Sequence, residues 1–80
     1  MMTIKILLRG TLPKYLNGEK ERIVEVQEGL NCDEVLKSQG MDYKEIPRFG
    51  FVAVNGLRVM IDQELFDGDE LKAYSKISGG

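Results

Sequence analysis

Only one segment of this 80-residue chain carries the signals of a regular helix, and that segment is short. Asn31 is a residue type that caps helices, and Glu34 three positions later completes the pattern of a capping box. The segment has a narrow apolar stripe made of Cys32, Val35 and Leu36. One such helix can cover only one face of a sheet, so any strands in the chain must share it.

Five other segments alternate apolar and polar residues or are rich in β-branched and aromatic residues, which is typical of strands. They are Thr3–Arg9, Arg22–Gln27, Phe49–Val54, Leu57–Ile61 and Glu70–Ile77. With a single helix available, we expect an α+β fold in which a mixed sheet of about five strands wraps around one main helix. The first and last strands would be parallel neighbours in the centre of that sheet.

The connections between these segments contain residues that favour turns. Asn55-Gly56 separates two strand patterns and is the strongest short-range signal of a β-hairpin, because both residues tolerate a positive φ. Asp67-Gly68-Asp69 predicts a second turn before the last strand. The longer connection Gly10–Lys20 contains apolar residues, so we expect part of it to pack against the body. These apolar residues are Leu12, Tyr15 and Leu16.

Composition excludes several kinds of chemistry. The chain has no histidine and a single cysteine, so it cannot assemble a zinc site or a four-cysteine iron–sulfur cluster, or form an internal disulfide. A net charge of −2 lacks the basic excess of proteins that bind nucleic acid. No apolar run is long enough to cross a membrane. We therefore expect a cytoplasmic domain with no bound cofactor or metal, which in any covalent chemistry would be the molecule acted upon.

The sequence closes on Ser78-Gly79-Gly80. Glycine has no Cβ, so an extended glycine pair can enter a slot too narrow for other residues. A terminal glycine would also leave its α-carboxylate open to activation by an enzyme. We therefore expect residues 1–80 to form one domain in which residues 78–80 are a mobile tail. In this interpretation Gly80 carries the reactive carboxylate and Gly79 allows the tail to thread.

The element order and the glycine pair together resemble the β-grasp, ubiquitin-like sulfur carriers of the MoaD/ThiS family, and the MoaD branch in particular. Three segments carry the resemblance, and they are Ile4–Leu12, Val52–Gly56 and Leu65–Leu71. The last of these resembles the family's leucine-x-aspartate-glycine-aspartate step into the final strand. Tyr74 supplies the aromatic residue that usually precedes the tail, but the prolines usual in MoaD proteins are missing.

The resemblance implies a function in sulfur transfer. A ubiquitin-activating-type enzyme (MoeB/ThiF-like) would use ATP to adenylate the Gly80 carboxylate, and a sulfur donor would convert the adenylate into a thiocarboxylate. In the MoaD branch, a larger molybdopterin synthase subunit (MoaE-like) receives this sulfur to build the molybdenum or tungsten cofactor. The chain would then be the small subunit of that synthase, a carrier and not an enzyme.

Other functions remain open at this stage. A ThiS-like carrier would serve thiazole synthesis for thiamine, although the long Gly10–Lys20 connection favours the MoaD branch. A related carrier would thiolate tRNA. The same tail would also suit a protein modifier that forms isopeptide bonds to lysines. A plain β-grasp binding module would not need its glycine pair.

Some side chains outside the tail are candidates for contact with a partner protein. The strand-rich region after Pro47 has more apolar residues than one buried face needs, so some of them should form a docking surface. The candidate partner-binding residues are Phe51, Leu57, Met60, Lys72 and Lys76. We interpret Cys32 as a small apolar residue under the sheet, with a reactive thiol as the alternative. The acidic residues around Gly68 are interpreted as a solvated turn that could also steer a basic partner.

Overall fold

The computed structural model describes residues 1–76, and within them the chain forms one mixed sheet, one α-helix and two 3-10 helices. The strands are β1 (Met2–Leu8), β2 (Glu21–Val26), β3 (Phe49–Val54), β4 (Leu57–Val59) and β5 (Glu70–Ser75). The helices are η1 (Leu12–Leu16), α1 (Cys32–Ser38) and η2 (Tyr43–Glu45). This is the predicted order of the strands and of the main helix.

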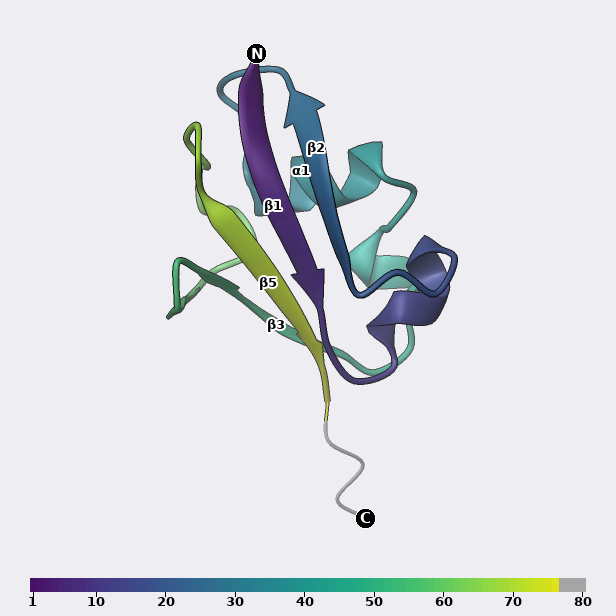
Figure 1. The fold of residues 1–80 in the computed structure, drawn as a ribbon. Helices are drawn as coiled ribbons and strands as arrows, with labels where there is room; N and C mark the ends of the chain where they lie inside the picture. The colour runs from purple at the N-terminus through teal and green to yellow at the C-terminus, as the bar shows by residue number, and fades with distance from the viewer. Residues whose placement is uncertain (77–80) are drawn as a thin grey trace.

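The five strands lie in the order β2-β1-β5-β3-β4, with α1 against one face of the sheet (Figure 1). The two central strands β1 and β5 are parallel, and Ile6 lies opposite Leu71 in their register. The other neighbouring strands are antiparallel. A mixed sheet around one helix with the chain's first and last strands in its centre is a β-grasp arrangement, so the predicted fold class is confirmed.

The core lies between the sheet and α1. Alternate residues of the two central strands point toward the helix and are fully buried, because a strand directs every second side chain to the same face. These are Ile4, Ile6 and Leu8 of β1 and Leu71 and Ala73 of β5. From the helix, the predicted stripe of Cys32, Val35 and Leu36 is buried against them. We call the opposite side of the sheet, which faces away from α1, its outer face.

The start of α1 forms as the sequence predicts. The Asn31 side chain accepts a hydrogen bond from the Glu34 N–H, and the Glu34 carboxylate accepts one from the Asn31 N–H, which completes the capping box. At the other end, the N–H groups of Gly40 and Met41 donate to the carbonyls of Lys37 and Leu36. This pair of bonds is a Schellman motif, with Gly40 in the left-handed conformation that ends the helix.

The predicted return strand Leu57–Ile61 is shorter in the structure and ends at Val59. The backbone after Val59 forms hydrogen bonds with the start of α1 instead of with β3. The carbonyls of Ile61 and Gln63 accept hydrogen bonds from the N–H groups of Asp33 and Cys32, the first residues of α1. Since these carbonyls satisfy the start of the helix, the segment turns away from β3 instead of extending the hairpin. At the end of the chain, the predicted last strand includes Ile77, which lies outside the described residues.

Candidate functional site

The residues predicted to react, Gly79 and Gly80, and the predicted mobile tail 78–80 lie outside the described residues. The backbone that precedes them is described up to residue 76. The central strand β5 ends at Ser75, and Lys76 is the last residue that the structure describes. The anchoring of this point therefore determines where any tail begins.

Hydrogen bonds attach the end of β5 to the domain on both sides. On the side of β1, the Ser75 Oγ accepts a hydrogen bond from the Thr11 N–H at 3.1 Å. On the side of β3, the Lys76 N–H donates to the Arg48 carbonyl at 2.6 Å. The chain beyond Lys76 thus starts from a backbone position held by two neighbouring segments. We call residues 75 and 76 the tail anchor.

Two glycines pack closely against this anchor. A Cβ added to Gly50 would lie 2.8 Å from the Tyr74 carbonyl oxygen and 3.1 Å from the Lys76 nitrogen, both of them backbone atoms. A Cβ on Gly10 would lie 1.9 Å from the Ser75 Oγ, and Gly10 also has a φ of +70°. Only glycine allows the neighbouring segments to approach the end of β5 this closely. Glycine at these two positions is therefore part of what fixes the anchor.

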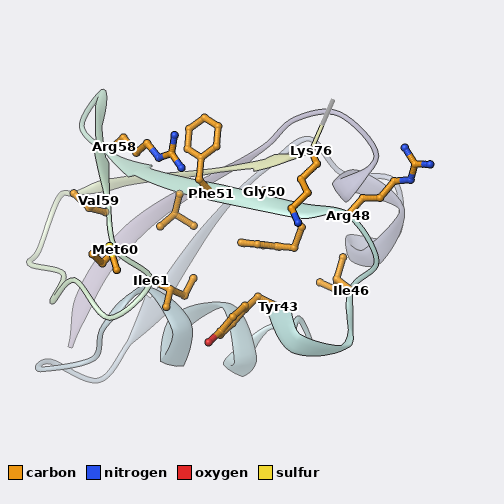
Figure 2. Close-up of a pocket in the computed structure, with 12 residues that line it drawn as sticks. Tyr43, Ile46, Arg48, Gly50, Phe51, Arg58, Val59, Met60, Ile61 and Lys76 are labelled. Carbon is orange, nitrogen blue, oxygen red and sulfur yellow. The ribbon is translucent and has the colours of Figure 1, made fainter. Parts of the chain in front are cut away.

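Beside the anchor, the outer face of the sheet carries two aromatic rings and a guanidinium group in contact. The rings of Phe51 and Tyr74 stack with centroids 4.6 Å apart and planes inclined by 16°. The Arg58 guanidinium lies 4.4 Å from the centroid of the Phe51 ring, and Figure 2 shows both side chains pointing to the same side of β3. These contacts hold three large side chains in one arrangement on the surface. We call Phe51, Tyr74 and Arg58 the outer-face stack.

The structure brings some of the predicted partner-binding residues together and separates others. Phe51 and Lys72 share the outer face, since Phe51 lies opposite Tyr74 and Lys72 is two residues before Tyr74 on β5. Lys76 is exposed at the tail anchor. Leu57 is 72% exposed, but it lies opposite Val54 at the hairpin tip and points to the helix side of the sheet. Met60 is 76% exposed and follows β4 at the edge of the sheet.

Tyr74 and Arg58 were not among the residues predicted to bind a partner. The sequence of the hairpin nevertheless contains a signal that places Arg58 next to Phe51. Asn55 and Gly56 both have positive φ, 51° and 88°, and form a two-residue turn, which places Arg58 opposite Ala53. Ala53 is two residues from Phe51, so both lie on the same face. The register of the turn therefore predicts a contact between Arg58 and the ring of Phe51.

Cys32 has no exposed surface, and burial raises the pKa of its thiol to about 11. A thiol with a raised pKa is protonated at neutral pH and is a poor nucleophile. The interpretation of Cys32 as an apolar core residue is therefore the one that the structure supports.

The acidic turn around Gly68 has a structural function. The Asp67 carboxylate accepts a hydrogen bond from the Thr3 N–H at 2.7 Å. The Asp69 carboxylate accepts from the Phe66 N–H at 2.9 Å and from the Asn55 side chain at 2.8 Å. Asn55 in turn accepts from the Glu70 N–H, so the acidic turn fastens the β3–β4 hairpin to the start of β5.

Within residues 1–76, no group of three or more acidic or cysteine side chains is arranged to hold a metal ion. None of the helices formed by these residues is long and apolar enough to span a membrane. The features that stand out in this part of the chain are the tail anchor and the outer-face stack beside it.

No protein-family model matches the sequence, and no curated protein matches it either. Solved structures do match over nearly the whole chain. Small archaeal modifier protein 1 from Haloferax volcanii superposes with a TM-score of 0.77 at 15% identity, covering 96% of this chain and 100% of that one. A Pyrococcus furiosus protein, whose proposed identity is subunit 1 of molybdopterin converting factor, superposes with a TM-score of 0.73 at 22% identity, with 96% and 100% covered.

A third match comes from a complex of two proteins. The structure of subunits 1 and 2 of the molybdopterin-converting factor from Helicobacter pylori contains a chain that superposes with a TM-score of 0.62 at 17% identity. The alignment covers 99% of this chain and 100% of that one. At these identities the likeness establishes the ubiquitin-like β-grasp fold, which small carrier and modifier proteins share.

Proposed function

We propose that this chain is a ubiquitin-like sulfur carrier of the MoaD/ThiS type and that the carboxylate of Gly80 is its reactive group. The observation that carries the proposal is a β-grasp domain whose last strand ends in a fixed anchor, with Gly79-Gly80 closing the sequence four residues beyond Lys76. A domain of this kind presents its own main-chain end to an enzyme. The likeness of the fold to a converting-factor subunit and to a modifier protein supports this function.

In the proposed reaction, a ubiquitin-activating-type enzyme (MoeB/ThiF-like) binds the domain together with ATP. The Gly80 carboxylate attacks the α-phosphate, pyrophosphate leaves, and an acyl-adenylate forms. A sulfur donor that delivers sulfide then displaces AMP and leaves a thiocarboxylate. The adenylate is needed because a carboxylate resists substitution until one of its oxygens becomes part of a good leaving group.

The side chains of this domain would position the tail and leave the chemistry to the partners. The tail anchor at Ser75 and Lys76 sets a constant starting point for the tail. The outer-face stack offers a rigid aromatic surface with one cation, which is the composition of well-bound interface centres. When a partner docks on this surface, the distance between its active site and the tail anchor would always be the same. Such positioning lowers the entropic cost of the reaction.

Among the pathways that could receive the sulfur, we propose molybdopterin synthesis first. The Helicobacter pylori structure supports it, because that structure holds subunits 1 and 2 of the molybdopterin-converting factor in one complex. The corresponding partner here would be a larger molybdopterin synthase subunit (MoaE-like). Pull-down with the purified chain, followed by identification of the captured protein and its bound pterin, tests this choice. Capture of a thiazole synthase or a tRNA-thiolating enzyme would replace it.

A second function, conjugation to proteins, is favoured by the likeness to small archaeal modifier protein 1. In that case the activated Gly80 would form isopeptide bonds with lysines. Immunoblots of cell extracts would then show slower-migrating species that disappear when Gly80 is deleted. A thiocarboxylate without such species favours the carrier, and both products together indicate a dual function.

The activation step is tested by ATP–pyrophosphate exchange. The chain is incubated with the ubiquitin-activating-type enzyme of its own genome, ATP and labelled pyrophosphate, and label should appear in ATP. Deletion of Gly79 and Gly80 should abolish the exchange. Lys14→Ala, an exposed change in η1, is the matched control and should leave it intact. Exchange that survives the deletion would contradict the proposal.

A further inference from the structure

A groove with a volume of about 480 Å³ lies between the β3–β4 hairpin and η2. Figure 2 shows side chains from η2, from the hairpin and from the tail anchor around it. Its apolar lining is formed mainly by Tyr43, Ile46, Phe49, Val59, Met60 and Ile61. We call this the hairpin groove. It lies at the edge of the sheet, since β4 has only β3 as a neighbour in the described sheet.

The floor of the hairpin groove is apolar and only partly covered. The rings of Tyr43 and Phe49 are in tilted contact, with centroids 5.8 Å apart. Phe49, Val59 and Ile61 pack against the core but keep part of their surface exposed, and Met60 is 76% exposed. A continuous apolar area of this kind on a small domain marks a binding surface more often than isolated exposed residues do.

The charges along the hairpin groove are of one sign. Arg48, Arg58 and Lys76 line it, and none of its described lining residues is acidic. This is unusual in a chain that has 13 acidic and 11 basic residues. Within residues 1–76, none of the three cations forms an ion pair with a carboxylate of the chain. The groove therefore combines an apolar floor with positive charge that the described domain leaves uncompensated.

We propose that the hairpin groove binds an extended segment of a partner protein in which an aliphatic or aromatic side chain is flanked by carboxylates. The apolar side chain would occupy the floor, and the carboxylates would meet Arg48 and Lys76 at the end beside the tail anchor, since the Arg58 guanidinium lies on the outer face over the Phe51 ring. The exposed edge of β4 allows such a segment to lie alongside the sheet. This binding does not depend on the proposed function, because it requires neither Gly79 nor Gly80.

The probe is a fluorescein-labelled peptide of ten residues, capped at both ends, in which one phenylalanine and one leucine are separated and flanked by aspartates. Fluorescence anisotropy measures its affinity, and amide chemical shifts in ¹⁵N-labelled protein locate the bound peptide. We expect saturable binding, with the largest shifts at Phe49, Val59 and Ile61. A peptide with lysines in place of the aspartates, and one with serines in place of the apolar residues, should both bind more weakly by about tenfold or more.

Substitutions in the protein supply the second test. Arg48 and Lys76 are exposed, so Arg48→Asp with Lys76→Glu should leave the fold intact and weaken peptide binding by about tenfold or more. Lys14→Glu with Lys20→Glu makes the same change in net charge away from the groove and should leave the affinity unchanged. Removal of Gly79 and Gly80 should also leave it unchanged, which separates this result from the proposed function.

Three outcomes would overturn the proposal. The first is equal binding by the two charge variants, which indicates a nonspecific effect of net charge. The second is chemical shifts confined to Lys72 and Tyr74, which lie on the outer face and do not line the groove. The third is concentration-dependent self-association of the free protein, with shifts at both the groove and the acidic turn, which would identify a second copy of this chain as the occupant.

Discussion

Replacing Gly50 with alanine tests whether the close packing around the tail anchor stabilises the domain. The added Cβ would lie 2.8 Å from the Tyr74 carbonyl oxygen, 3.0 Å from the Ser75 carbonyl carbon and 3.1 Å from the Lys76 nitrogen. All three atoms belong to the backbone of residues 74–76, at the end of β5 and just beyond it, so no side-chain rotation can relieve the contact. Either β3 or the end of β5 must move.

The expected magnitude follows from two opposing effects. Inserting a methyl group into a packed site costs about 1–3 kcal/mol of unfolding free energy. Alanine restricts the unfolded chain more than glycine does, which returns about 0.4–1 kcal/mol. Gly50 lacks the positive φ of the other glycines in the described part of the chain, so no conformational strain is added. We expect a net loss of about 1–2 kcal/mol, equivalent to a fall in Tm of about 5–12 °C for a domain of this size.

Urea denaturation and thermal unfolding followed by circular dichroism measure this loss. The ¹⁵N–¹H spectrum should also change most at Ser75 and Lys76, because the displaced backbone belongs to the tail anchor. Gly18→Ala is the control, since no described atom lies within 4 Å of its added Cβ and its cost reflects only a φ of +83°. If Gly50→Ala is as stable as the unmodified protein, with unchanged signals at the anchor, the packing argument is wrong.

Three further experiments test the helix cap, the buried thiol and the outer-face stack. Asn31→Ala removes the capping box and should lower the unfolding free energy by about 1 kcal/mol in urea denaturation, whereas an unchanged midpoint would contradict the cap assignment. Burial raises the pKa of the Cys32 thiol from about 9 to about 11, so between these pH values the unfolded chain loses the thiol proton more readily than the folded one. The contribution of the buried, protonated thiol to the free energy of unfolding is therefore complete below pH 9 and is lost as the pH rises toward 11. Urea titrations should therefore show a steeper decline above pH 9 than Cys32→Ala shows, and equal slopes would refute the assignment. A double-mutant cycle between Arg58→Leu and Phe51→Leu should give a coupling of about 0.5–1 kcal/mol, while no coupling would mean that the stack is not formed in solution.

The parts of the fold that were predicted correctly depend on neighbours in sequence. The capping box joins residues three apart, and the Asn55-Gly56 turn needs only the conformations of two adjacent residues. The alternation of Ile4, Ile6 and Leu8 likewise follows from the geometry of a single strand. These local signals, together with one helix that must cover one face of the sheet, were sufficient to predict a mixed sheet around that helix, and the family resemblance identified the arrangement as a β-grasp.

The features that were missed depend on contacts between distant segments. The end of β4 at Val59 is set by the N–H groups of Cys32 and Asp33, which bind carbonyls about thirty residues away along the chain. The tail anchor similarly depends on Thr11 and Arg48, and nothing in their local sequence indicates that they hold the end of β5. The hairpin groove was also missed, because its apolar floor and its cations come from η2, the hairpin and the end of β5.

The central claim is that the reactive group of this chain is its own main-chain end, and tandem mass spectrometry tests it most directly. The purified chain is incubated with ATP, its activating enzyme and a sulfur donor, then fragmented. We predict that one oxygen is replaced by sulfur and that the replacement is confined to fragments containing Gly80. Sulfur on a fragment that contains Cys32 but not Gly80, or no sulfur after complete ATP turnover, would contradict the account.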